Sequence, residues 1–110
     1  MDSIGAVQVL ERPKVTAAKI LCISLNVRDF PRITEDDLLA IFRTGSVPAI
    51  FHPRFEEFFY DCIRWGNQGL KRFMRENGLT AGDVANVFHS LPPFMRSERF
   101  QEALDSGELG

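Results

Sequence analysis

Apolar residues recur at helical spacing over most of the chain after residue 33. The first stripe is formed by Leu38, Leu39, Ile41 and Phe42. Thr34 and Asp37 precede it at the two positions of a capping box, in which each side chain bonds the backbone N–H of the other residue. Gly45 suits the left-handed position that ends a helix, and Pro48 prevents its continuation. The pattern predicts a helix over residues 34–44.

A longer apolar stripe follows between residues 53 and 77. It is formed by Phe55, Phe58, Phe59, Cys62, Ile63, Leu70, Phe73 and Met74. Gly66 and Gly69 lie on the same stripe, where glycine can kink a helix. Because the helical phase is kept across both glycines, the pattern predicts one kinked helix, closed at Asn77 and Gly78.

Residues 79–90 repeat the pattern of residues 33–44 without a gap. Both segments read apolar, Thr, two variable residues, Asp, two apolar residues, one variable residue, apolar, Phe, basic and hydroxyl. Thr80 and Asp83 therefore take the same capping-box positions as the earlier pair. A structural repeat and the independent occurrence of two common cap motifs both explain the match. Either explanation predicts two helix-loop-helix units that bury their Phe-rich faces against each other.

The second unit continues through a break at Pro92-Pro93 to a last helix that Ser97 caps. This helix carries Phe100, Ala103 and Leu104. If one deletion is allowed, Pro48 aligns with Pro93 and the match extends to Arg54-Phe55 on Arg99-Phe100.

The N-terminal part has a different pattern. Leu21, Ile23, Leu25 and Val27 alternate with more polar residues, and this period of two predicts a strand. Residues 6–11 are compatible with a second strand, so we expect a short N-terminal hairpin. A helix is the rival, since Ala17, Ala18 and Ile20 also suit one. The predicted fold is a single, mainly helical α+β domain over residues 1–110, with residues 1–5 and 106–110 flexible.

Composition narrows the functional classes. Ten Phe against one Tyr and one Trp favour a large core or an apolar docking face. A net charge of -2 argues against broad electrostatic binding to nucleic acid or anionic membranes. The chain has no run of apolar residues as long as a membrane helix and no signal-peptide pattern, so we expect a cytoplasmic protein without membrane contact.

No set of residues converges on a catalytic or metal site. The candidate ligands Cys22, Cys62, His52 and His89 lack the paired spacing of a zinc site. Cys62 lies on the apolar stripe, where a buried thiol is a small hydrophobe. The sequence therefore predicts a protein that is not an enzyme and has no cofactor.

Residues 80–101 resemble a helix-turn-helix DNA-binding motif. Thr80–Phe88 matches the first helix of that motif, with the small Ala85 where two helices cross. The resemblance implies a transcriptional regulator whose second helix contacts DNA through Arg96 and Arg99. The chain departs from the motif at His89, which stands where the turn usually carries glycine.

The interpretation that we favour is a small protein-binding module that modulates or inhibits a larger partner. Its small size, single domain and lack of catalytic or metal-binding motifs are typical of phage- or plasmid-encoded inhibitors of host machinery. The predicted surface joins the loops 46–52 and 91–96, which proline stiffens. Core packing is the alternative role of its aromatic residues. The predicted partner-binding residues are Phe94, Met95, Arg96, Arg99, Phe51, His52, Arg64, Lys71, Arg72 and Arg75.

Overall fold

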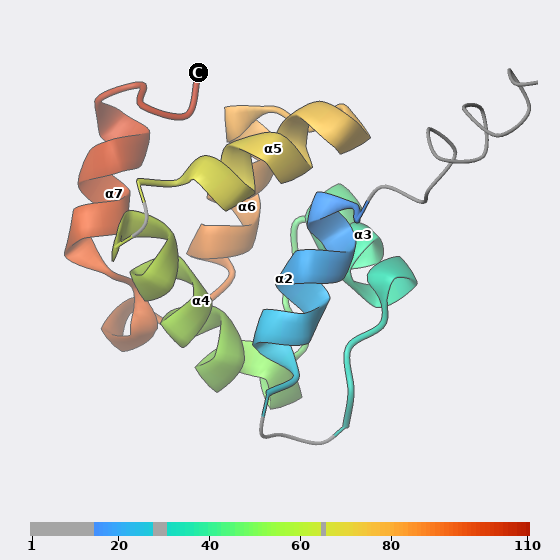
Figure 1. The fold of residues 1–110 in the computed structure, drawn as a ribbon. Coiled ribbons are helices and arrows are strands. Elements are labelled where there is room, and N and C mark those ends of the chain that lie inside the picture. The colour runs from blue at the N-terminus through green and yellow to red at the C-terminus, as the bar shows by residue number, and fades with distance from the viewer. Residues whose placement is uncertain (1–14, 28–30, 65) are drawn as a thin grey trace, which may run out of the picture.

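The computed structural model describes residues 15–27, 31–64 and 66–110, and the regular elements in these ranges are all helices (Figure 1). The described residues form six α-helices, namely α2 (Ala17–Leu25), α3 (Glu35–Thr44), α4 (His52–Arg64), α5 (Gln68–Asn77), α6 (Ala81–His89) and α7 (Glu98–Asp105). Two short 3-10 helices precede α4 and α7, namely η1 (Ala49–Phe51) and η2 (Pro93–Met95). The prediction of a mainly helical fold is confirmed.

The predicted strand over residues 21–27 is wrong, because α2 occupies most of this segment. Thr16 caps α2 by accepting a hydrogen bond from the Lys19 backbone N–H at 3.1 Å. The face that packs against α3 and α5 consists of Ala17, Ala18, Leu21, Cys22 and Leu25. A helix buries all five of these residues together, whereas a strand would divide them between two faces. The proposed partner strand, residues 6–11, and residues 1–5 lie outside the described residues.

The single kinked helix predicted for residues 53–77 is also wrong. The chain forms two helices, α4 and α5, separated by a turn at residues 66 and 67. Gly66 and Asn67 both have positive φ values, 71° and 61°, which no right-handed helix can contain. The apolar phase survives the turn because both helices bury the same aromatic core, not because the helix continues.

The two capping boxes are confirmed. The Thr34 hydroxyl accepts from the Asp37 N–H at 3.1 Å, and the Asp37 carboxylate accepts from the Thr34 N–H at 3.0 Å. Thr80 and Asp83 form the same reciprocal pair at 3.1 and 2.8 Å. Ser97 caps α7 as predicted.

The two helix-loop-helix units pack against each other as expected from their apolar faces. The first helices of the units, α3 and α6, are in contact, and so are the second helices, α4 and α7. Pro48 precedes η1 and Pro92 precedes η2, with nearly equal backbone angles (φ -56°, ψ 142° and φ -57°, ψ 148°). The structural match of the turns therefore pairs Pro48 with Pro92, not with Pro93 as the sequence alignment had it.

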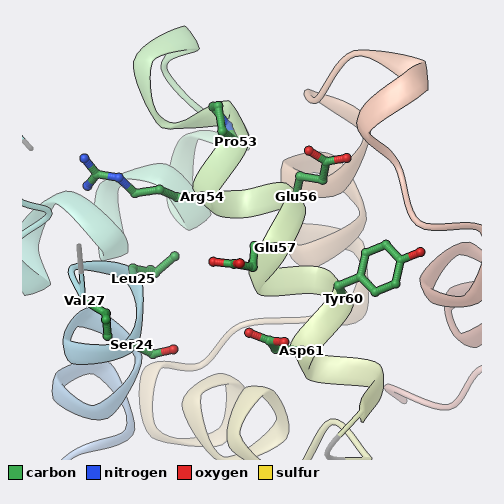
Figure 2. Close-up of a pocket in the computed structure, with 9 residues that line it drawn as sticks. All are labelled: Ser24, Leu25, Val27, Pro53, Arg54, Glu56, Glu57, Tyr60 and Asp61. Atoms are coloured by element: carbon green, nitrogen blue, oxygen red, sulfur yellow. The ribbon is translucent and has the colours of Figure 1, made fainter. Parts of the chain in front are cut away.

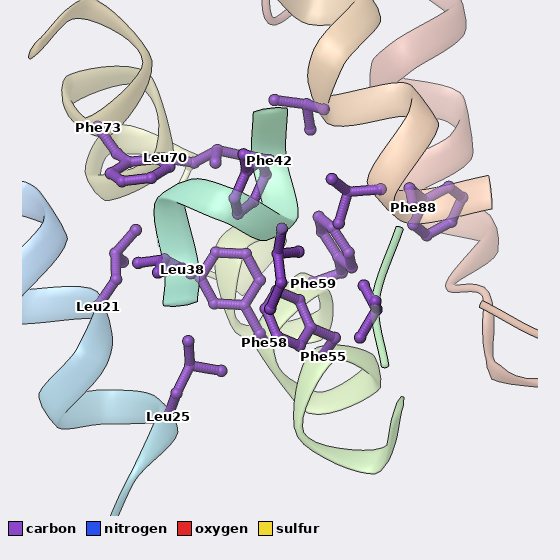
Figure 3. Packing of buried hydrophobic residues seen from close by; sticks show 14 of the residues in the cluster. Leu21, Leu25, Leu38, Phe42, Phe55, Phe58, Phe59, Leu70, Phe73 and Phe88 are labelled. Carbon is purple, nitrogen blue, oxygen red and sulfur yellow. The ribbon is translucent and has the colours of Figure 1, made fainter. Parts of the chain in front are cut away.

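Phenylalanine rings join the two units (Figure 3). Phe59 on α4 lies 5.2 Å from Phe88 on α6 and 4.5 Å from Phe100 on α7, measured between ring centroids. Phe42 on α3 meets Phe73 on α5 at 5.2 Å. Most of the phenylalanine side chains are therefore buried in the core.

Residues 106–110, for which the sequence predicts a flexible tail, form turns beside α5. Leu109 is buried, and the Glu108 carboxylate accepts a hydrogen bond of 2.6 Å from the Asn67 amide.

Gly45 has two separate reasons to be glycine. Its φ is 73°, and an added Cβ would lie 2.8 Å from the Cβ of Asn86 on α6. Gly78 has a similar φ of 65° but open space around it. We therefore expect Gly45→Ala to lower the free energy of unfolding by about 2 kcal/mol and Gly78→Ala by about 1 kcal/mol, because only the first adds overpacking to backbone strain. Urea unfolding measures both; equal losses would contradict the close approach of α3 and α6.

Candidate partner-binding surfaces

The 3-10 turn η2 presents the most exposed large apolar side chain among the described residues. Phe94, at its centre, is 81% exposed. The backbone around it is held by hydrogen bonds from Met95 N–H to Pro92 O (2.9 Å) and from Arg96 N–H to Pro93 O (3.2 Å). Met95 is half-buried. The turn therefore holds an aromatic ring in water on a rigid support.

The Arg96 side chain fastens this turn to the end of α6. Its Nε donates to Leu91 O at 2.9 Å and its Nη2 donates to His89 O at 2.7 Å. Both acceptors are backbone carbonyls near a helix C-terminus, where a cation is favourable. Arg96 thus positions the turn, and this role was not foreseen from the sequence.

The matching turn η1 exposes Ile50, which is 61% exposed and occupies the same central position as Phe94. Its neighbour Phe51 is buried instead, with the Arg54 guanidinium 5.1 Å above its ring. His52 is half-buried, and its Nε2 lies 2.9 Å from Val47 O. Of the residues predicted for this loop, Phe51 therefore belongs to the core, and Ile50 is the exposed residue that sequence reasoning missed.

A shallow cavity of about 400 Å³ lies beside η1. Its lining residues are Pro31, Arg32, Asp37, Ala40, Ile41, Thr44, Ser46, Pro48 and Phe51. The cavity is lined by α3 and by the segments on either side of it, so the first unit offers both an exposed apolar residue and a neighbouring recess.

The basic residues predicted on α5 do not join the surface around η1. Arg72 pairs with Glu76 at 2.6 Å and also donates to Val15 O at 2.5 Å, so it ties α5 to the start of α2. Lys71 is half-buried on the same helix, while Arg75 and Arg64 are exposed. In Figure 1, α5 lies at the opposite end of the molecule from the turn that begins α4. The basic residues of α5 and the η1 turn therefore belong to separate surfaces.

The DNA-binding alternative stays a prediction. Eight residues, Ser90–Ser97, separate α6 from α7. Arg96 is engaged with backbone carbonyls, whereas Arg99 is exposed on α7. The exposed side of α7 also carries Glu98, Glu102 and Asp105, and these carboxylates would repel a phosphate backbone.

Both cysteines are thiols in environments that disfavour the thiolate. Burial, with smaller contributions from Glu35 and Asp37, raises the pKa of Cys22 to about 11. Burial and the nearby Asp61 raise the pKa of Cys62 to about 12. Neither thiol is activated as a nucleophile at neutral pH. Within the described ranges, no three His, Cys, Asp or Glu side chains gather as metal ligands would.

A larger groove of about 760 Å³ separates α2 from α4 (Figure 2). It is lined by Ser24, Leu25, Val27, Pro53, Arg54, Glu56, Glu57, Tyr60 and Asp61. Figure 2 shows the Glu57 and Asp61 carboxylates directed from α4 towards α2, while Tyr60 points away from α2. No part of this groove was predicted from the sequence, since its α2 wall was interpreted as a strand.

Comparisons of the chain with protein-family models, with curated proteins and with solved structures find no match. None of the described helices has the length and apolar character required to cross a membrane.

Proposed function

We propose that this protein is a small protein-binding module that modulates or inhibits a larger partner, with the cytoplasm as its compartment. The observation that supports the proposal best is Phe94, an aromatic side chain held 81% exposed at the centre of a rigid turn. Exposed aromatic anchors on ordered backbone are typical of residues that dominate the binding energy of protein interfaces.

The fold does not need Phe94 where it lies. Six other phenylalanines are fully buried, so the core is complete without it. Exposing a phenyl ring forgoes the gain of about 1.5–3 kcal/mol that burial brings, and a partner's surface would recover this free energy. Because η2 is braced by Arg96, little backbone entropy remains to be lost on binding.

The equivalent position in the first unit supports the same proposal. Ile50 is exposed at the centre of η1, beside the recess lined by Pro48 and Phe51. Both turns pack against α4, so this helix sets the distance between the two exposed residues. We propose Phe94 as the main anchor and Ile50 as a second contact.

Replacing Phe94 with alanine is expected to weaken partner binding by about 30-fold, the loss typical of a central aromatic anchor. The measurement is affinity capture from extracts of the encoding organism, with quantitative mass spectrometry of the protein retained, followed by titration of that protein. Ile50→Ala should give a smaller loss. Val15→Ala, which alters an exposed apolar residue just before α2, serves as the matched control.

Phe94→Ala should leave the helical circular dichroism and the urea midpoint unchanged, because the ring makes little contact with the core. Equal capture by the wild type and by Phe94→Ala would contradict the proposal. Recovery of DNA instead of protein, lost in Arg99→Ala and at raised salt, would favour the regulator alternative.

A further inference from the structure

Residues 106–110 are joined to the rest of the fold through two side chains. Leu109 is buried and belongs to the hydrophobic core cluster. The Glu108 carboxylate accepts a hydrogen bond of 2.6 Å from Nδ2 of Asn67, in the turn between α4 and α5. Among the described residues, the backbone of this segment forms hydrogen bonds only with the end of α7 and within itself. One apolar side chain and one hydrogen bond therefore fasten the segment to the α4–α5 turn.

The Asn67 side chain is not used to cap its own helix. Asn67 occupies the N-cap position of α5, where the side-chain oxygen of an asparagine normally accepts a bond from the first turn. Here the backbone is left-handed, with a φ of 61°, and the side chain makes no such bond. Glycine suits this backbone at least as well, so the conformation alone does not require asparagine.

The amide of Asn67 is instead buried with one of its two polar atoms unpaired. The residue is 1% exposed, and its Nδ2 bonds Glu108. Among the buried side-chain nitrogen and oxygen atoms of the described residues, Oδ1 of Asn67 is the one without a hydrogen-bond partner. A buried acceptor without a donor is costly, and a ligand that supplies an N–H relieves this cost.

The two contacts define the chemistry that the site accepts. Nδ2 of Asn67 is a donor that suits a carboxylate, and the partial positive charge at the start of α5 favours the same group. The recess that Leu109 fills accepts a leucine-sized apolar side chain. The site therefore suits an extended segment in which an acidic residue is followed by leucine.

We propose that Asn67 and the recess beneath Leu109 bind a segment of a partner protein that carries a glutamate followed by a leucine. Without the partner, residues 106–110 occupy the site and act as a displaceable strap. Gly107 has a φ of 77° and open space around it, so the strap can swing away from α7 at this residue. A partner segment that also donates an N–H to Oδ1 of Asn67 makes one more hydrogen bond than the strap does and displaces it.

This site and the proposed anchor Phe94 lie at opposite ends of α7, because η2 precedes this helix and the strap follows it (Figure 1). The proposal does not depend on which protein Phe94 contacts. Its failure and the failure of the proposed function are therefore distinguishable.

The probe is a fluorescently labelled peptide with the sequence of residues 105–110, and its binding to the full chain is measured by anisotropy. In the wild type the strap competes at an effective concentration that is roughly millimolar, so we expect weak binding. Leu109→Ser removes the apolar anchor of the strap and should raise the affinity for the peptide by about tenfold. A peptide with glutamine in place of the glutamate should bind this variant about fivefold more weakly.

Three further variants test the individual contacts. Glu108→Gln weakens the strap without altering the core and should raise the affinity for the peptide by about threefold. Asn67→Gly keeps the left-handed turn but removes the amide. Combined with Leu109→Ser, it should bind the glutamate and glutamine peptides equally. The matched control is Glu102→Gln, which removes a carboxylate from the exposed side of α7 and should bind the peptide as the wild type does.

Leu109→Ser should keep its helical circular dichroism, and its unfolding would overturn the proposal, since a displaceable strap is not required for the fold. Equal peptide affinity of the wild type and Leu109→Ser would also overturn it, as would equal affinity of Leu109→Ser for the glutamate and glutamine peptides. A wild-type dimer in sedimentation that Leu109→Ser abolishes would do the same, because the site would then hold the strap of a second copy of this chain.

Discussion

Replacing Phe59 with alanine is expected to lower the free energy of unfolding by about 3–5 kcal/mol, the range for deleting a fully buried aromatic side chain. Phe59 is 1% exposed and lies at the junction of both helix-loop-helix units. Its ring centroid lies 5.1 Å from that of Phe58, 5.2 Å from that of Phe88 and 4.5 Å from that of Phe100. Truncating the Phe59 side chain therefore removes an apolar contact that α4 makes with both α6 and α7.

The measurement is urea unfolding followed by circular dichroism, on wild type and variant under the same conditions. A decrease of this size can unfold a small domain completely. Phe59→Leu is therefore a milder substitution, for which we expect about half of the decrease in the free energy of unfolding. Phe94→Ala removes the same side chain from an exposed position and should change stability by less than about 0.5 kcal/mol. Similar losses at positions 59 and 94 would contradict the division between core and surface phenylalanines.

Replacing Asn26 with alanine is expected to lower the free energy of unfolding by about 3–4 kcal/mol, although the side chain removed is polar. The Asn26 side chain donates to Ile33 O at 2.7 Å and accepts from Ile33 N–H at 2.7 Å, and both residues are buried. This pair of bonds fixes the end of α2 to the segment before α3. Without the amide, both backbone groups of Ile33 stay buried and unpaired, and each such group costs about 1–3 kcal/mol.

The Asn26→Asp variant adds a test by pH. It keeps an acceptor for the Ile33 N–H but sets a carboxylate oxygen against the Ile33 carbonyl, so the pKa of the introduced carboxyl should rise on folding. Stability should then be highest below the ordinary pKa of an aspartate and fall as pH rises through the raised value. Unfolding midpoints at acidic and neutral pH, each compared with wild type, measure this.

Asn77→Ala is the matched control for the alanine variant, since the Asn77 amide makes one local bond to Phe73 O within its own helix. If Asn26→Ala lowers the free energy of unfolding no more than Asn77→Ala does, the hydrogen bonds to Ile33 do not stabilise the fold.

The candidate sites were only partly predictable from sequence. Phe51 and Phe94 both follow a proline in a loop of similar composition, yet Phe51 is buried and Phe94 is exposed. The difference arises because Phe51 is the third residue of its turn and Phe94 is the second of its own. The loop sequences do not show where the 3-10 turn begins, so Ile50 was missed and Phe51 was taken in its place.

The groove was beyond sequence reasoning for another reason. Its walls come from residues about thirty positions apart, and they face each other only after α2 and α4 have packed. The period-two pattern of residues 21–27 is also compatible with a strand, and it conceals the fact that Ile23 lies on the exposed side of a helix that ends at Leu25.

The sequence by itself determined where the helices begin and end wherever the signal is local. Thr34, Thr80 and Ser97 cap helices, and Gly45 and Gly78 end them in the left-handed conformation. These interactions span three or four residues, so nothing distant has to be known. Only the tertiary structure decided that residues 17–25 are helical, that the chain turns at Asn67 and which apolar residues stay in water. Those outcomes depend on which faces find a partner, and burial against distant segments outweighs the weak preferences of any single stretch of chain.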